Sequence, residues 1–559
     1  MIKNQSIVKQ ILEMNDTLIE TTEYLYKIAK EHDFTAFENI STDMHDLINS
    51  IYNIIVNIKN EENLIISMDI ACESVQDSLN RIIMLSKTRS QKLFDKIEFE
   101  LIPLLQEMYL QLYFWECIYP DREKMKYYYN NEMKKLSSNK YINESEKKGK
   151  YKYELSIVVI GYNKLEYTKL CIESLLKYLP NDINYELILI NHGSTDGTKE
   201  YFESIAPTKQ VDIMKNGSLV SVIARIIEGK YHLIISNDVL VTENAISNMI
   251  KCMESDENIA WIVSSTPNVS NYQAINASYT DMDEMYKFAS ENNISDSYRW
   301  EQRPRLCNPI SLCRSKTFLS TNGICFTGYF HSSTFLAFPD DKLSLLLRRN
   351  GYKMILAKDA YCYHFGSITI NDDIAKYKDK NGNIGGQAFL NEGKQEFYNA
   401  FGIDPWGTGC CFNEKLFKYL PCNDTKHVDI LGINCGIGSN PLKVKESIKE
   451  IAHNLDVTIY NITDEENYIE DLKGISNVAE YINSCGDIDR IFTGKKFKYI
   501  IFESKIETYK DPLLIISELK KRLVEDGIIG IKTLDKNLQI NIKSNFLNSI
   551  QSDEWIILK

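Results

Sequence analysis

An aspartate and a distant histidine are the residues of this chain whose chemistry is easiest to interpret. The stretch Tyr231–Leu240, YHLIISNDVL, contains an apolar run typical of a buried strand, and the run ends in Ser236-Asn237-Asp238. A carboxylate at the carboxyl end of a strand in an open α/β sheet lies where such sheets bind ligands. Together with His364, Asp238 suits a divalent ion that keeps coordination positions open for diphosphate oxygens. The two residues therefore indicate an enzyme that handles a nucleotide-activated substrate.

Strands and helices alternate from Leu155 onward, and these elements must position the side chains of Asp238 and His364. The expected strands are residues 155–160, 186–191, 211–214 and 232–236. The expected helices are Leu165–Leu179, which Pro180 ends, and a second helix that Asp196 or Thr198 opens. Such an alternation predicts a parallel sheet with helices on its faces.

A second region with the same texture begins near His427. Strands are expected at residues 428–433, 456–461, 497–503 and 527–532, with helices after the first strand, through Glu450, and at Pro512–Leu523. The first of these strands is followed by a glycine-rich turn, Asn434-Cys435-Gly436-Ile437-Gly438. The region predicts a second α/β unit.

The N-terminal residues differ in composition from the rest of the chain. Residues 1–148 contain no glycine and only two prolines, Pro103 and Pro120. Ile11, Leu18 and Leu25 recur at seven-residue spacing, which is typical of amphipathic helices. We expect a bundle of long helices, followed by a polar linker at Lys135–Lys150.

Composition limits the classes of function. With 559 residues, several domains are expected, and a net charge of −13 argues against nonspecific binding to nucleic acid or to an anionic membrane. No apolar run approaches the roughly 20 residues of a membrane span, and the first residues lack a signal-peptide core. The thirteen cysteines form no CxxC pair, which favours free thiols. We therefore expect a cytoplasmic protein without membrane insertion.

Five motifs resemble, in order, those of the family 2 glycosyltransferases, which have the GT-A fold. They lie between Leu155 and Ile370 and read SIVVIGYNK, LILINHGSTDGT, IISNDV, FPDDKLSLLLRRNGYK and AYCYHFGS. The resemblance implies an inverting transferase that uses a nucleotide-sugar donor and a divalent metal, Mn²⁺ or Mg²⁺. Metal ions of this kind neutralise the charge on a departing diphosphate.

The resemblance assigns roles to five residues of the last three motifs. Asp238 would bind the metal directly and His364 would complete the site. Asn237 replaces an acidic residue that is common in the family, so it would offer a weaker, neutral oxygen. Asp340 falls on the position of the general base, which takes the proton from the acceptor hydroxyl. The adjacent Asp341 would take that role if the register is off by one.

The first two motifs are implied to bind the nucleotide. Tyr162 and Asn163 follow the first strand, where the family binds it. Asn191 replaces an aspartate that accepts a hydrogen bond from the uracil ring in the family, and an amide oxygen can still accept that bond. One of Arg348 and Arg349 could reach phosphate, but a solvated helix face is the simpler explanation of both.

The C-terminal region resembles the class I methyltransferases that use S-adenosylmethionine. DILGINCGIGSN matches their glycine-rich loop, so Gly436, Gly438 and Asp487 would carry any cofactor binding. Asn434 and Asn461 depart from that family's usual residues. The tail 533–559 is short where the family usually has two more strands. We therefore expect a degenerate domain that does not use S-adenosylmethionine.

Together these observations predict an α/β protein with three domains. A helical bundle at 1–148 precedes a GT-A glycosyltransferase domain at 153–405 and a degenerate, Rossmann-like methyltransferase-fold domain at 425–559. The junction EGKQEFYNAFGIDPWGTGCCFN resembles glycosyltransferases of flagellin-modification clusters. That resemblance implies transfer of N-acetylglucosamine from UDP-GlcNAc to Ser or Thr hydroxyls of flagellin. Two alternatives remain: a transferase that extends a glycan or polysaccharide, and a non-enzymatic scaffold, which Asn237, Asn191 and Asn461 keep open.

Overall fold

Two compact units make up the chain, and each is assembled from segments that are distant in sequence. The computed structural model describes residues 5–62, 68–90, 92–118, 121–127, 139–214, 219–322, 338–366, 375, 382–483 and 491–559. Unit 1 comprises Met1–Ser247, Pro309–Pro339 and Cys362–Glu396, and unit 2 comprises Asn248–Asn308, Asp340–Tyr361 and Phe397–Lys559. The domain boundaries expected from the sequence stay a prediction.

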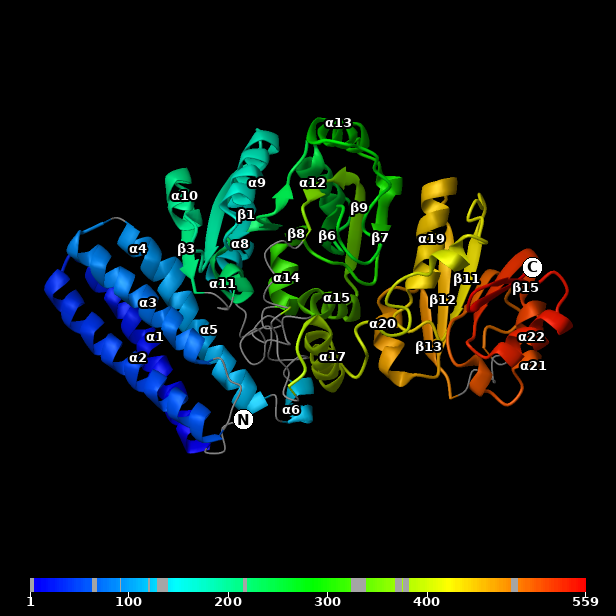
Figure 1. Ribbon diagram of the computed structural model, residues 1–559, viewed down its shortest axis with the longest axis horizontal. Coiled ribbons are helices and arrows are strands. Elements are labelled where there is room, and N and C mark those ends of the chain that lie inside the picture. The colour runs from blue at the N-terminus through cyan, green and yellow to red at the C-terminus, as the bar shows by residue number, and fades with distance from the viewer. Residues whose placement is uncertain are drawn as a thin grey trace. The chain divides into compact units, whose positions relative to one another are not determined.

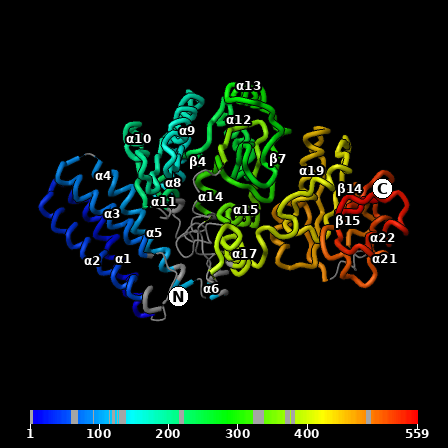
Figure 2. Tube along the Cα trace, viewed as in Figure 1, coloured from blue at the N-terminus to red at the C-terminus, as the bar shows by residue number. Residues whose placement is uncertain are grey.

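Long helices form the N-terminal part of unit 1, as the composition indicates. Their bounds are α1 Gln5–Lys30, α2 Phe34–Glu62, α3 Met68–Lys87, α4 Lys92–Lys96, η1 Ile97–Leu101, α5 Ile102–Tyr113, η2 Phe114–Ile118 and α6 Arg122–Tyr127, where η1 and η2 are π-helical. Helices α1, α2, α3 and α5 lie side by side (Figures 1 and 2). The seven-residue repeat Ile11, Leu18 and Leu25 is fully buried, which confirms the amphipathic face.

The segment expected to be a linker is in part an ordered helix. Helix α8 spans Lys140–Lys148, and the Asn139 side chain caps it by accepting from the amides of Tyr141 and Ile142. The Asn139 amide nitrogen also donates to the carbonyl oxygens of Ala224 and Ile227. The linker prediction was wrong for residues 139–148, because Asn139 both caps the helix and bonds to carbonyl groups that are distant in sequence. Residues 135–138 lie outside the described part.

The sheet of unit 1 has the order β3-β2-β1-β4-β8. Its strands are β1 Tyr153–Gly161, β2 Tyr185–His192, β3 Lys209–Ile213, β4 Gly229–Ser236 and β8 Ile310–Arg314. The first four are parallel, as predicted, and β8 runs antiparallel to β4. Helices α9 Leu165–Tyr178, α10 Thr198–Ile205 and α11 Leu219–Ile226 connect the strands, and α14 Ser315–Asn322 follows β8. A short antiparallel pair, β5 Val239–Leu240 and β10 Tyr363–His364, lies beyond β4 in the chain.

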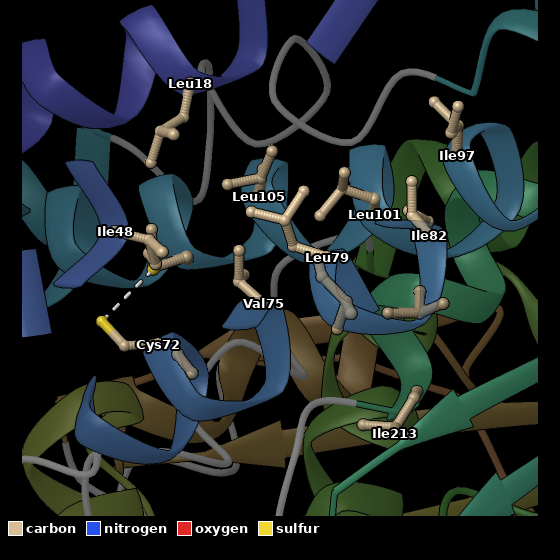
Figure 3. Close-up of a cluster of buried hydrophobic side chains, with 14 of the residues drawn as sticks. Leu18, Ile48, Cys72, Val75, Leu79, Ile82, Ile97, Leu101, Leu105 and Ile213 are labelled. Carbon is tan, nitrogen blue, oxygen red and sulfur yellow. Dashed lines mark hydrogen bonds between the residues drawn. The ribbon is translucent and has the colours of Figure 1, made fainter. Parts of the chain in front are cut away.

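One apolar core joins the N-terminal helices to this sheet. The cluster includes Leu79 and Ile82 of α3, Leu105 of α5, and Ile213 of β3 (Figure 3). Cys72 belongs to the same cluster, and its thiol donates to the Met108 sulfur at 3.6 Å. Because the core is shared, the helices and the sheet of unit 1 depend on the same buried apolar surface for stability.

A buried ion cluster lies at the amino ends of the parallel strands. The Lys209 ammonium at the start of β3 donates to Glu186 at 2.6 Å, to Glu228 at 2.8 Å and to the Ile226 carbonyl at 2.7 Å. Lys209 is 3% exposed and Glu186 is fully buried. These charges lie opposite the strand ends that bind ligands in such sheets, so we assign them to stability.

Unit 2 contains three strands in the order β6-β9-β7 and a separate seven-stranded sheet. The three strands are β6 Ile259–Ser265, β7 Trp300–Gln302 and β9 Lys353–Tyr361; nearby helices are α12 Ala245–Ser255, α13 Met282–Asn292, η4 Ser297–Arg299 and α15 Pro339–Arg349. Strand β6 is parallel to β9, and β7 is antiparallel to it. Helix α17 Gly386–Phe401 begins in unit 1 and ends in unit 2, and α18 Glu414–Phe417 follows it in unit 2.

The C-terminal sheet has the order β13-β12-β11-β14-β15-β17-β16. Its strands are β11 Val428–Ile433, β12 Val457–Thr463, β13 Val478–Tyr481, β14 Phe497–Phe502, β15 Leu523–Lys532, β16 Ile550–Ser552 and β17 Trp555–Leu558. Its helices are α19 Ser439–Ala452, η7 Glu466–Tyr468, α20 Ile469–Lys473, η9 Ile506–Thr508, α21 Pro512–Lys521 and α22 Lys536–Asn545. The tail 533–559 was expected to be too short for two more strands; it forms α22, β16 and β17, and β17 is antiparallel to β15.

Buried ion pairs connect the two parts of unit 2. Arg348 and Arg349 of α15 both pair with Asp471 of α20, and Arg348 is 2% exposed. The interpretation of these arginines as a solvated face was therefore wrong. Glu301 of β7 pairs with Lys443 of α19 at 2.9 Å. In the part of the chain that the structure describes, no helix combines the length and the apolarity needed to cross a membrane.

The Lys209 cluster gives a direct test of what stabilises unit 1. Lys209→Met leaves two buried carboxylates without their shared cation, so we expect the free energy of unfolding to fall by about 3–5 kcal/mol. Urea denaturation followed by circular dichroism measures this change. Lys169→Met, which removes an exposed pair with Glu166, is the control and should cost less than about 1 kcal/mol. Equal effects of the two substitutions would contradict the assignment.

Candidate active site

Asp238 and His364 meet in unit 1 although they lie far apart in the sequence. The antiparallel pairing of β5 with β10 places His364 opposite Val239, the residue after Asp238. The Phe365 amide donates to the Asp238 carbonyl at 3.0 Å. As a result, His364 Nε2 lies 3.3 Å from Asp238 Oδ2, and the side chains are 8% and 3% exposed.

The geometry of this pair fits a shared divalent ion. Ligand atoms about 2.1 Å from an octahedral cation, in adjacent positions, are roughly 3 Å apart. The observed separation of 3.3 Å is close to that value. Within the described ranges, no group of three or more His, Cys, Asp or Glu side chains could hold a metal. Among the described residues the site therefore has two protein ligands, Asp238 and His364, and oxygens of a bound diphosphate could complete the coordination.

Asn237 connects the end of β4 to the loop after β1. Its amide nitrogen donates to the Asn163 carbonyl at 3.0 Å and to the Thr168 hydroxyl at 2.8 Å. The residue is 3% exposed. This side chain therefore holds the neighbouring loop in place, in addition to any oxygen that it offers to a ligand.

Two loops at the carboxyl ends of β1 and β2 are held together by the residues expected to bind the nucleotide. Asn163 adopts a left-handed conformation, with φ of 53°, which asparagine tolerates better than most residues. Its amide donates to Ser194 Oγ at 3.0 Å, and its side-chain oxygen accepts from the Thr195 amide at 2.9 Å. The half-buried Tyr162 ring contacts the His192 ring edge-on.

Asn191 lies at the end of β2 and is 5% exposed. Its side-chain oxygen accepts from the Ser194 amide at 3.1 Å, and its amide nitrogen donates to Asp212 Oδ1 at 3.2 Å. Sequence reasoning did not single out Asp212. The sequence feature that could have identified Asp212 is its position within the expected strand VDIM, because a charged side chain buried in a strand needs a partner.

The two adjacent aspartates of α15 have different surroundings in unit 2. Asp341 is buried and ion-paired with Arg305. Asp340 is half-buried and accepts from the Asn308 amide at 3.0 Å. Burial raises the pKa of Asp340 to about 7; the Asn308 amide opposes this shift, and the negative charge of Asp341 adds to it. Of the two, Asp340 is therefore the carboxylate suited to proton transfer near neutral pH.

The glycine-rich turn of the C-terminal sheet is covered by the chain itself. The amides of Ile437 and Ser439, at the start of α19, donate to the carbonyls of Thr408 and Gly409 at 3.2 Å each. A Cβ on Gly436 would clash with the Thr408 carbonyl, and one on Gly438 would clash with the Ile475 side chain. The amides of Ile437 and Ser439, which could otherwise donate to a bound ligand, are thus already used.

The polar residues near this turn are also engaged within unit 2. Asn461 is fully buried and donates to Ser476 Oγ at 2.7 Å. Asn434 donates to the Tyr509 hydroxyl at 2.9 Å and accepts from the Asp464 amide at 3.1 Å. The expected cofactor residue Asp487 lies outside the described residues. That this sheet does not use S-adenosylmethionine stays a prediction, and these contacts are its physical reason.

Comparison with known proteins defines the class of the central region. Residues 156–303 match the family described as Glycosyl transferase family 2. This stretch is therefore a family 2 glycosyltransferase domain of the GT-A type, which confirms the predicted enzyme class, EC 2.4, for this domain. The C-terminal α/β sheet has no assigned identity, and a comparison with curated proteins gives no match.

Several solved structures are similar to part of the chain. They include GalNAc-T7 with UDP, GalNAc and Mn²⁺, at 11% identity, TM-score 0.30, and coverage of 38% of this chain and 43% of that one. The mannosyltransferase PcManGT from Pyrobaculum calidifontis with GDP-Man and Mn²⁺ has 13% identity, TM-score 0.27, and coverage of 44% and 68%. S. aureus TarS 1-349 has 14% identity, TM-score 0.26, and coverage of 45% and 72%. The chain thus spans less than half the length of the GalNAc-T7 chain.

The raised pKa of Asp340 predicts a pH-dependent stability. Between its ordinary value near 3.8 and about 7, the folded protein keeps a proton that the unfolded chain has lost. Stability from this carboxyl is therefore full below pH 4 and is lost as the pH rises through 7. Relative to Asp340→Asn, the wild type should lose about 2 kcal/mol of unfolding free energy between pH 5 and 8. Urea denaturation of both proteins at several pH values measures this difference. An unfolding free energy that depends on pH in the same way in both proteins would contradict the raised pKa of Asp340.

The covered glycine turn predicts that S-adenosylmethionine does not bind. Calorimetry with the full chain should give no binding heat at micromolar concentrations, because the Thr408 and Gly409 carbonyls occupy the amides that a cofactor needs. UDP with Mn²⁺, titrated in the same cell, serves as a comparison ligand. A micromolar dissociation constant for S-adenosylmethionine would contradict this interpretation.

Proposed function

We propose that this protein is an inverting, metal-dependent glycosyltransferase that moves N-acetylglucosamine from UDP-GlcNAc to Ser or Thr hydroxyls of flagellin. The observation that carries the transferase proposal is the convergence of Asp238 and His364 at 3.3 Å beyond the end of β4. The sugar and the acceptor rest on the resemblance of residues 392–413 to flagellin-modifying enzymes.

The donor half of the reaction belongs to residues of unit 1. Asp238 and His364 would hold Mn²⁺ or Mg²⁺, which neutralises the charge on the departing diphosphate. Asn191 would accept the ring N–H of uracil, since a carbonyl oxygen has two lone pairs and the Ser194 amide uses one. Tyr162 and Asn163 lie on the loop that would contact the nucleotide.

The acceptor half belongs to Asp340. In a direct displacement, the acceptor oxygen bonds to the anomeric carbon as the nucleoside diphosphate leaves, and the configuration inverts. Asp340 would take the hydroxyl proton. With a pKa of about 7, this carboxylate is a stronger base than an ordinary aspartate, yet a large fraction of it is ionised at neutral pH. Asp341, which is paired with Arg305, would hold α15 and not take part in proton transfer.

We also propose that the enzyme acts in the cytoplasm. The cysteines that the structure describes are free thiols, among them the buried Cys72, Cys171 and Cys435. Free thiols in this number suit a reducing compartment.

Intact-mass analysis tests this function. Flagellin incubated with the enzyme, UDP-GlcNAc and Mn²⁺ should gain N-acetylhexosamine units. Asp238→Ala and Asp340→Ala should each abolish the gain, a loss of at least about a hundredfold, because one removes a metal ligand and the other the base. Asp283→Ala, at an exposed position of α13, is the matched control and should keep the wild-type rate.

The same assay separates the alternatives. Donor turnover without any change in flagellin mass would favour a glycan- or polysaccharide-extending enzyme. No turnover with any nucleotide sugar, with Mn²⁺ present, would favour a scaffold. Near-wild-type transfer by either alanine variant would remove that residue from the mechanism.

A further inference from the structure

A chain of buried polar contacts runs from the N-terminal helices to Asn191. Its centre is Glu100 of η1, which is fully buried. Glu100 accepts from Ser78 Oγ at 2.8 Å, from Arg81 at 2.6 Å, from the Lys96 ammonium at 2.7 Å and from the Asp212 amide at 2.8 Å. The last contact joins the helices to strand β3.

Asp212 extends this chain of contacts into the sheet. Its Oδ2 lies 2.7 Å from the Lys96 ammonium, and its Oδ1 accepts from the Asn191 amide nitrogen at 3.2 Å. Arg81 also donates to the Asp212 carbonyl at 3.1 Å. The two carboxylates, Glu100 and Asp212, and the two cations, Lys96 and Arg81, balance one another, which the burial of such charges requires.

The charge state of Asp212 determines what it can do to Asn191. Burial raises the pKa of Asp212, but the positive charges of Lys96, Lys199 and Arg81 together outweigh burial, and the net pKa is lowered. An ionised carboxylate only accepts hydrogen bonds. The Asn191 amide must therefore turn its NH₂ group toward Asp212 and its oxygen toward the Ser194 amide and the nucleotide loop.

This constraint matters because asparagine is ambiguous. An aspartate at the end of β2 would present an acceptor in either orientation, whereas an asparagine presents an acceptor or a donor depending on how its amide is turned. A base with a ring N–H, such as uracil, needs an acceptor. A base with an unprotonated ring nitrogen at the same place, such as cytosine, needs a donor.

We propose that Asp212, ion-paired with Lys96 of the N-terminal helices, is a positioning residue that sets the base specificity of the donor site by fixing the Asn191 oxygen toward the base. This inference rests on the proposed function, in which Asn191 meets the uracil ring. The helices then have a role in donor selection that goes beyond the apolar core they share with the sheet.

Asp212→Asn tests the proposal because it keeps the size of the side chain and removes its charge. The new amide at position 212 should keep its oxygen on the Lys96 ammonium and turn its NH₂ group toward Asn191. Position 212 then no longer opposes turning over of the Asn191 amide, and only the Ser194 amide still favours the present orientation. We expect the dissociation constant for UDP, measured by calorimetry with Mn²⁺, to rise roughly tenfold. The preference for UDP over CDP should fall to within about twofold. Melting temperatures show that each variant is folded.

An exchange of the two side chains gives a rescue. In the double variant Asn191→Asp, Asp212→Asn, the new amide at 212 donates to the new carboxylate at 191, which presents an acceptor to the base in either orientation. The double variant should regain the wild-type preference for UDP. A purely structural role of Asp212 predicts no such recovery.

Glu107→Gln is the matched control. It weakens another ion pair in unit 1, in which Glu107 of α5 lies 3.0 Å from Arg225 of α11, and this pair includes no residue of β2 or β3. UDP affinity should stay within about twofold of the wild type. A comparable loss of UDP selectivity in Glu107→Gln would overturn the proposal.

The outcomes separate this inference from the proposed function. A wild type that selects UDP and a folded Asp212→Asn variant that selects it equally well would overturn the inference alone. A wild type that binds neither UDP nor CDP with Mn²⁺ would overturn the uridine-donor function, and the inference with it. Loss of selectivity in Asp212→Asn together with recovery in the double variant supports both.

Discussion

The antiparallel pairing of β5 with β10 is the constraint on which the candidate site depends. Each strand has only two residues, Val239–Leu240 and Tyr363–His364. This short ladder holds an imidazole 3.3 Å from the Asp238 carboxylate, whose position is set by the end of β4. A buried strand thus fixes one ligand and a local pairing fixes the other, so the separation of the two atoms does not depend on flexible side chains alone.

Burial of charge is the second theme of the structure. Lys209 pairs with two carboxylates at the amino ends of the strands, and Lys96 pairs with two more near the carboxyl end of β2. Asp341 is paired with Arg305, whereas the adjacent Asp340 accepts from a backbone amide, and burial raises the pKa of both carboxyls. The ion-paired groups maintain the fold, and Asp340, with a pKa of about 7, is the carboxyl suited to chemistry.

Local patterns in the sequence predicted the elements well, but not the contacts between distant segments. Apolar runs and turn residues located β1 and β2 to within two residues and β4 to within three, and the strand-end position of Asp238 followed from them. The contacts of Asp212 with Lys96 and of Thr408 with the glycine turn join residues far apart in the chain. Helical propensity likewise did not predict that the polar segment expected to be a linker forms helix α8. That helix is capped by Asn139, whose amide nitrogen bonds to the distant Ala224 carbonyl.

Electron spin-echo spectroscopy of Mn²⁺ bound together with UDP tests the central claim most directly. It detects a nitrogen nucleus coordinated to the ion. The account predicts an imidazole nitrogen signal in the wild type that disappears in His364→Gln while Mn²⁺ stays bound through Asp238 and the diphosphate. A bound ion without nitrogen coupling in the wild type, or a signal that persists in the variant, would contradict it.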